Sequence, residues 1–156
     1  MATRSTIALE FADGTVQQVY SHWDGYLEHN GAILLENYTD PFKLRDLIDL
    51  GDISSLGPNI GTKHPFSPHE SADAQAEYEA AEKAGATTFY GRDRGETGID
   101  ARKFANFEDY KANHQYAEYE YILRQVDGKA VWFVSQYGRA YTPLADALEA
   151  TKKVAA

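Results

Sequence analysis

The stretch "STIALEFADGTVQQVYSHW", residues 5–23, decides the fold. Its first part alternates in polarity, so that Ile7 and Leu9 share one face of an extended chain while Thr6 and Ala8 share the other. Asp13-Gly14 follows, and a second alternating run occupies 16–23. An Asp-Gly pair between two such runs is typical of a β-hairpin. We therefore predict antiparallel strands at 5–11 and 16–23.

A second hairpin signal lies near the C-terminal end of the sequence. Residues 117–126 ("AEYEYILRQV") alternate, an Asp-Gly pair follows at 127–128, and "KAVWFVS" continues at 129–135. The stretch "ATTFYGR" at 86–92 has the β-branched and aromatic content of one further strand. These patterns predict about five strands, which are mostly antiparallel because tight hairpin turns join them.

The segments between the strands carry helix signals. Asn30 is a predicted N-cap, Asp40 and Pro41 open a second helix that Gly51 stops, and "SPHE" at 67–70 is a capping box. The residues 51–65 are expected to form a loop. The expected helices cover 30–38, 41–50, 68–84, 107–113 and a last segment after 143.

Together these elements predict an α+β fold with helices packed mainly on one face of the sheet. The length of 156 residues favours a single globular domain over 1–156. The segment 67–85 is rich in alanine and glutamate and offers little apolar surface, so it is expected to be a surface helix or an insertion.

Composition narrows the classes of function. The net charge is −9, from 24 acidic and 15 basic side chains, and such a surface is repelled by phosphates, so direct nucleic-acid binding is not expected. The chain contains no cysteine, which excludes disulfides and thiolate metal sites. There is neither an apolar signal core nor a run of 18 apolar residues, so we expect a cytoplasmic protein without membrane contact.

The first candidate site lies in "HWDGY", residues 22–26, where His22, Trp23, Asp24 and Tyr26 follow a predicted strand. A titrating imidazole, a carboxylate and aromatic rings at a strand end are suited to ligand binding. The alternative is a structural turn at Asp24-Gly25 in which Trp23 packs inward. Both interpretations remain open on the sequence.

The second candidate site is "FYGRDRGETG", residues 89–98. Glycines allow the backbone to approach a ligand, and two arginines separated by one residue can bind a carboxylate or phosphate. The candidate ligand-binding residues here are Tyr90, Arg92, Arg94 and Glu96. The alternative is a surface network of arginine and acidic side chains.

Other chemistry finds no support in the sequence. His64 and His69 lack a third ligand at the usual zinc spacing, and no nucleophile motif or dinucleotide fingerprint is present. We therefore assign no catalytic residue, no metal and no cofactor.

The combined motifs resemble a family of small proteins encoded by tailed bacteriophages and prophages. The resemblance rests on "STIA" at 5–8, "HWDGY" at 22–26, "NGAILLENY" at 30–38, "LGDISSLG" at 50–57 and "FYGRDRGETG" at 89–98. It implies a phage accessory protein in the bacterial host cytoplasm. Such proteins often counter host defence, so the resemblance implies an anti-defence or host-modulating role.

Three functional hypotheses follow. The first is a non-enzymatic binding protein with an anti-defence or host-modulating role, which binds a host protein or sequesters a small anionic, nucleotide-like ligand. The second is a small hydrolase or transferase acting on a nucleotide-like substrate. The third is an acidic protein-interaction or nucleic-acid-mimic module that uses Glu77, Glu79 and Glu82. A homo-oligomer is compatible with each hypothesis.

Overall fold

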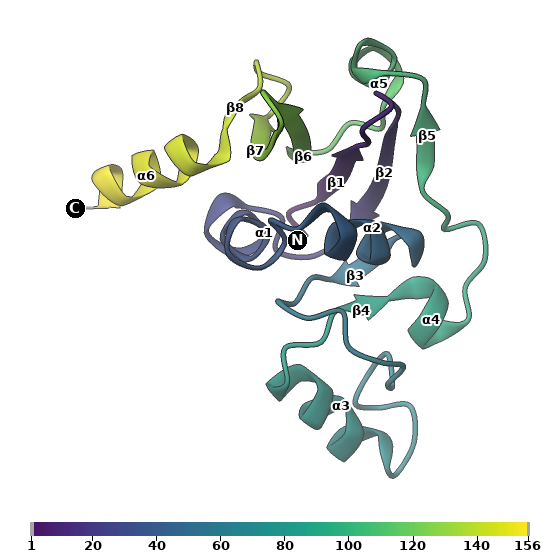
Figure 1. The fold of residues 1–156 in the computed structure, drawn as a ribbon. Coiled ribbons are helices and arrows are strands. Elements are labelled where there is room, and N and C mark those ends of the chain that lie inside the picture. The colour runs from purple at the N-terminus through teal and green to yellow at the C-terminus, as the bar shows by residue number, and fades with distance from the viewer. Residues whose placement is uncertain (1, 156) are drawn as a thin grey trace.

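The computed structural model describes residues 2–155, which form an α+β fold as the sequence predicts (Figure 1). Its eight strands are β1 (Ser5–Glu10), β2 (Val16–Ser21), β3 (Ile53–Ser55), β4 (Thr88–Phe89), β5 (Arg102–Phe104), β6 (Tyr119–Val126), β7 (Lys129–Gln136) and β8 (Thr142–Pro143). The helical elements are the π-helical turn η1 (Leu27–Gly31) and the helices α1 (Ala32–Asn37), α2 (Pro41–Asp49), α3 (Ala74–Lys83), α4 (Tyr90–Arg94), α5 (Phe107–Asn113) and α6 (Leu144–Ala155).

The two predicted hairpins, β1–β2 and β6–β7, are confirmed and form the centre of one mixed sheet. The strand order is β4-β3-β2-β1-β6-β7-β8, and β5 also pairs with β2. The hairpins meet through a parallel β1–β6 pair, in which Ser5 lies opposite Tyr119 and Leu9 opposite Leu123. The pair β2–β3 is parallel as well. The expectation of about five mostly antiparallel strands is therefore corrected to eight strands in a mixed sheet.

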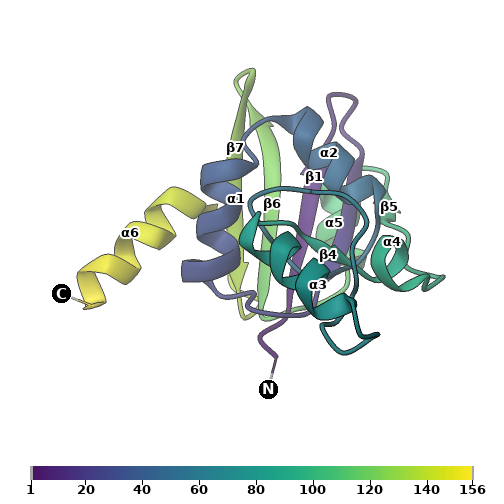
Figure 2. The same cartoon turned by 90° about the horizontal axis from the view of Figure 1, so that it is seen from below.

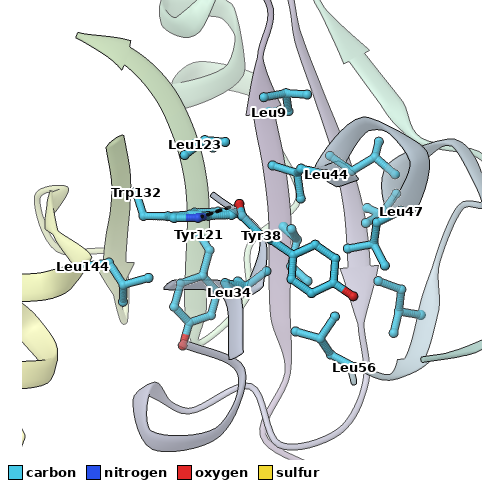
Figure 3. Close-up of a cluster of buried hydrophobic side chains, with 14 of the residues drawn as sticks. Leu9, Leu34, Tyr38, Leu44, Leu47, Leu56, Tyr121, Leu123, Trp132 and Leu144 are labelled. Carbon is cyan, nitrogen blue, oxygen red and sulfur yellow. Dashed lines mark hydrogen bonds between the residues drawn. The ribbon is translucent and has the colours of Figure 1, made fainter. Parts of the chain in front are cut away.

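The larger hydrophobic core lies between the sheet and the helices α1 and α2 (Figure 3). Ile7 and Leu9 face it from β1, and Leu34 and Leu44 face it from the helices. The indole Nε1 of Trp132 donates a hydrogen bond to the carbonyl of Tyr38 at 3.0 Å. This bond satisfies the one polar atom that the buried indole carries into the core.

A smaller core covers the opposite face of the sheet. Ala8, Val16 and Ile122 face it from the strands, and Tyr110 covers them from α5. Helices α1, α2 and α6 contribute to the larger core and α5 alone to the smaller one, so the helices pack mainly on one face, as expected, with α5 on the other. The N-cap of α5, Asn106, accepts a hydrogen bond from the amide of Asp109 at 2.8 Å and starts the helix across this face.

The corner after β2 differs from the predicted capped helix. Asn30 lies inside the turn η1, and its buried amide donates to the hydroxyls of Ser5 and Ser21 at 3.1 and 3.3 Å. Asn30 therefore joins β1 to β2 from within the core and does not cap a helix. Tyr121 adds a hydrogen bond from its hydroxyl to the carbonyl of Gly25 at 2.6 Å.

Two further elements differ from their predicted extent. The helix predicted from 68 begins at Ala74, because the hydrogen bonds around Ser67 and Glu70 close a separate turn. The strand predicted at 86–92 ends at Phe89, where Tyr90 starts the helical turn α4 that Gly95 terminates in a left-handed conformation. By contrast, the helix expected at 107–113 is confirmed.

The outer elements lie at the two ends of the sheet (Figures 1 and 2). Helix α6 projects away from the strands in both views, and α3 lies beyond β4 at the other end. Within the part of the chain that the structure describes, no helix combines the length and apolar character needed to cross a membrane.

Candidate functional site

The two candidate motifs lie on neighbouring strands. The amides of His22 and Trp23 donate to the carbonyls of β3 residues Ile53 and Ser54, each at 3.0 Å. Strand β4, which precedes the second motif, pairs with the other edge of β3. The topology therefore brings both motifs to the same half of the sheet.

The side chains of the first motif do not converge on one site. His22 Nδ1 lies 2.6 Å from the hydroxyl of Tyr20, and its ring meets the Trp23 ring edge-on at 4.6 Å. Trp23 and Tyr26 are exposed. Asp24 adopts a left-handed conformation with φ of 56° and lines a cavity. Among the four predicted residues of this motif, Asp24 alone lines that cavity.

The guanidinium of Arg92 is fully engaged within the protein. Its Nε and Nη2 donate to the carboxylate of Asp93 at 3.0 and 3.2 Å, and its other N–H groups bind the carbonyls of Ile60, Gly61 and Thr87 at 2.9–3.0 Å. All five N–H donors of an arginine are thereby used. Arg92 joins α4 to the preceding loop and has no donor left for an anionic ligand.

Arg94, Glu96 and Tyr90 form a group on the surface. Arg94 Nη2 lies 2.6 Å from Glu96 Oε2, and its guanidinium lies 4.5 Å from the ring centre of Phe66 and 5.0 Å from that of Tyr90. Burial raises the pKa of the Tyr90 hydroxyl above its usual value. None of the three lines the cavity that Asp24 faces.

That cavity, of about 380 Å³, connects the two motifs through His64, which the sequence did not identify as a binding residue. We call it the histidine cavity. Its main polar lining residues are Asp24, His29, His64, Tyr78, Glu82 and Thr88. The backbone amide of His64 donates to Asp93 at 3.1 Å, so the second motif supports the cavity wall from behind.

A second and larger cavity, of about 520 Å³, lies on the other face of the sheet, beside α5. We call it the aromatic-basic cavity. Its aromatic lining residues are Phe107, Tyr116, Phe133 and Tyr141, and its charged or titratable lining residues are Lys111, His114, Glu120, Arg124 and Arg139. None of these residues belongs to the candidate motifs of the sequence.

Glu120 forms the floor of the aromatic-basic cavity. This carboxylate is almost completely buried, and His114 Nε2 lies 2.8 Å from its Oε2. The hydroxyl of Tyr141 donates to its Oε1 at 3.3 Å and lies 3.0 Å from the hydroxyl of Tyr110. Desolvation raises the pKa of both tyrosines, so these hydroxyls stay protonated donors over a wide pH range.

The rim of the aromatic-basic cavity carries the cations. The Arg124 guanidinium lies 3.6 Å from the ring centre of Phe107 and is paired with Glu10 through Nε and Nη2. Lys111 pairs at 3.2 Å with Glu108, whose side chain is exposed. Within residues 2–155, the Arg139 side chain forms neither an ion pair nor a hydrogen bond. Positive charge is therefore available to a bound molecule.

Neither cavity has the donor set of a metal centre. Within residues 2–155, no three histidine, aspartate or glutamate side chains lie close enough together to bind a metal ion. Comparisons with family models, curated proteins and solved structures find no match for the chain.

Proposed function

We propose that the protein is a binding protein that sequesters a small anionic, nucleotide-like ligand in the aromatic-basic cavity. One observation carries the proposal: in a chain of net charge −9, Lys111, Arg124 and Arg139 gather around one concave site next to four aromatic rings. Concave sites with aromatic walls and a few fixed polar groups are the usual form of small-molecule sites.

The aromatic rings favour a planar ligand. Phe107 and Tyr141 meet at 5.8 Å in a T-shaped arrangement, so their ring faces point in different directions around the cavity. A base stacked on an aromatic ring gains about 1–3 kcal/mol. The Arg124 guanidinium beside Phe107 extends the planar surface. A flat ring system is therefore the class of ligand that fits this wall.

The charges favour an anion on that ring system. Arg139 has its donors free, and Lys111 would exchange an exposed partner for the ligand, a loss of less than about 1 kcal/mol. Arg124 keeps Nη1 for a ligand because Glu10 binds its other nitrogens. Phosphate or carboxylate groups can thus be held without breaking the buried pair at the floor.

The hydroxyl and imidazole groups of the cavity favour binding over catalysis. Ser135 donates its hydroxyl to the carbonyl of Arg139 at 2.6 Å. His114 places Nδ1 2.7 Å from the carbonyl of Tyr110 and Nε2 beside Glu120. Both nitrogens of the imidazole are occupied, so no nucleophile is paired with a free base. Sequestration in a bacterial host cytoplasm, with an anti-defence role, is the setting that the resemblance adds to this proposal.

The test is calorimetric titration of the protein with the four ribonucleoside monophosphates and with cyclic dinucleotides. We expect at least one to bind, with an affinity about tenfold or more lower in the double variant Lys111→Ala/Arg139→Ala. Arg94→Ala, which removes an exposed arginine outside the cavity, serves as the matched control and should bind as wild type.

Two results would contradict the proposal. Unchanged affinity in Lys111→Ala/Arg139→Ala would show that the ligand does not bind in the aromatic-basic cavity. Recovery of a reaction product after denaturation, detected by chromatography, would indicate a hydrolase or transferase. Sequestration returns the ligand intact.

A further inference from the structure

The histidine cavity differs in charge from the aromatic-basic cavity. Its walls come from η1 and the residues before it, from the segment 55–58, from His64, from α3 and from β4. No lysine or arginine is among its lining residues, while Asp24 and Glu82 are. An anion is therefore disfavoured in this cavity.

Hydrogen bonds hold His64 in place in the deep wall of the histidine cavity. The His64 side chain is only 7% exposed, its Nδ1 lies 3.0 Å from the carbonyl of Thr62, and its Nε2 lies 3.0 Å from the hydroxyl of Thr88. Because both ring nitrogens have partners, His64 shapes the cavity, and the charged acceptors in the cavity wall are the carboxylates of Asp24 and Glu82.

The two carboxylates have no cationic partner among residues 2–155. Neither Asp24 nor Glu82 forms an ion pair, and Glu82 lies beside the hydroxyl of Tyr78. The left-handed backbone of Asp24 is held by a hydrogen bond from the amide of Asn30 to the Asp24 carbonyl at 3.2 Å. The two carboxylates therefore carry uncompensated negative charge in the cavity wall.

Aromatic rings accompany these carboxylates. The rings of Tyr78 and His29 also line the cavity. The negative face of a tyrosine ring attracts cations, and this adds to the attraction by the carboxylates.

We propose that the histidine cavity binds an alkylammonium group, from either a lysine side chain or a free primary amine. Asp24 and Glu82 accept its N–H donors, and Tyr78 flanks its charge. This site is independent of the aromatic-basic cavity on the other face of the sheet and goes beyond the proposed function.

The experiment is an NMR titration that follows the imidazole resonances of His29 and His64. The probes are 1,5-diaminopentane and a lysine-containing peptide with blocked termini, with n-butanol as the uncharged control. We expect saturable shifts with at least one cationic probe and none with n-butanol. Tighter binding of the peptide assigns the site to a protein partner, and tighter binding of the diamine assigns it to a metabolite.

Two variants test the role of the carboxylates. Asp24→Asn preserves the left-handed backbone, which asparagine tolerates well, and Glu82→Gln preserves the shape of α3. Each should weaken binding about threefold, the magnitude typical of an exposed charge pair. Glu79→Gln, on the same helix and outside the cavity, is the control and should bind as wild type.

An equal loss of affinity in Glu79→Gln and Glu82→Gln would overturn the proposal, because the effect would then come from the net charge of the protein and not from the cavity. Equal shifts with n-butanol, or unchanged binding in both cavity variants, would do the same. Nucleotide binding in the opposite cavity is unaffected by these outcomes, so the two proposals fail separately.

Discussion

His114 Nε2 lies 2.8 Å from Glu120 Oε2 at the floor of the aromatic-basic cavity. The pair is enclosed by Tyr110 and Tyr141, and Glu120 Oε2 also accepts the amide of Ala117 at 3.2 Å. One carboxylate thus holds three segments together: the end of α5, the start of β6 and the approach to β8. The floor of the cavity is therefore also a structural joint.

Glu120→Ala should lower the free energy of unfolding by about 2–4 kcal/mol, because it leaves His114 and the Tyr141 hydroxyl without their buried acceptor. Urea denaturation measures this change. Glu118→Ala is the matched control one pleat away, since its ion pair with Arg4 is partly exposed. It should lose less than about 1 kcal/mol. A similar loss in both variants would argue against the floor as a structural joint.

Arg92→Ala should destabilise the fold by about 3 kcal/mol or more. The substitution leaves the buried Asp93 carboxylate without its ion-pair partner and three backbone carbonyls without donors. Thermal or urea denaturation provides the measurement. Arg94→Ala removes an exposed arginine two positions away and should cost less than about 1 kcal/mol. Comparable stability in the two variants would contradict the structural role given to Arg92.

The hairpins could be predicted because their determinants are local. Asp-Gly turns and alternating side chains fix β1–β2 and β6–β7 within short stretches of chain. Strands β3 and β5 have only three residues each, and they are extended because tertiary partners bind them. The carbonyl of Ile53, for example, accepts the amide of His22 at 3.0 Å. No local pattern could have indicated that pairing.

The candidate site was harder to predict than the fold. Clustering in sequence suggested that His22 and Asp24 act together, but β2 ends at Ser21 and the left-handed backbone of Asp24 turns the chain, while His22 lies against Tyr20. The two arginines of the second motif bind groups within the protein. Conversely, Lys111, Arg124 and Arg139 come together only through the β6–β7 register and the placement of α5. The alternation of residues 117–126 places Glu120 on one face of its strand but cannot show what opposes it.

Gly25 is required by the close approach of the chain before β1. A Cβ atom at this position would lie 2.7 Å from the Cβ of Ser5 and 2.8 Å from the carbonyl oxygen of Thr3. Gly25→Ala should therefore cost about 2 kcal/mol or more in unfolding free energy, through displacement of backbone. Gly98→Ala, where a Cβ meets no atom within 4 Å but φ is +73°, should cost only about 1 kcal/mol of backbone strain. Denaturation curves that reverse this order would show that the corner can relax.

Alkaline pH should destabilise the protein through its buried tyrosines. Desolvation raises the pKa of Tyr110, Tyr121 and Tyr141 above the ordinary value of 10.0. Above about pH 10 the unfolded chain loses these protons while the folded chain keeps them, so the free energy of unfolding falls as pH rises. Below that pH both states are protonated and the effect vanishes.

Denaturation midpoints measured from about pH 8 to about pH 11 test this dependence. Tyr141→Phe should flatten the alkaline decline, because one buried hydroxyl no longer titrates on unfolding. Tyr116→Phe, which removes a hydroxyl from an exposed ring, is the matched control and should keep the wild-type slope. If Tyr141→Phe declines as steeply as wild type, the alkaline sensitivity has a source outside the tyrosine and carboxylate network beneath the aromatic-basic cavity.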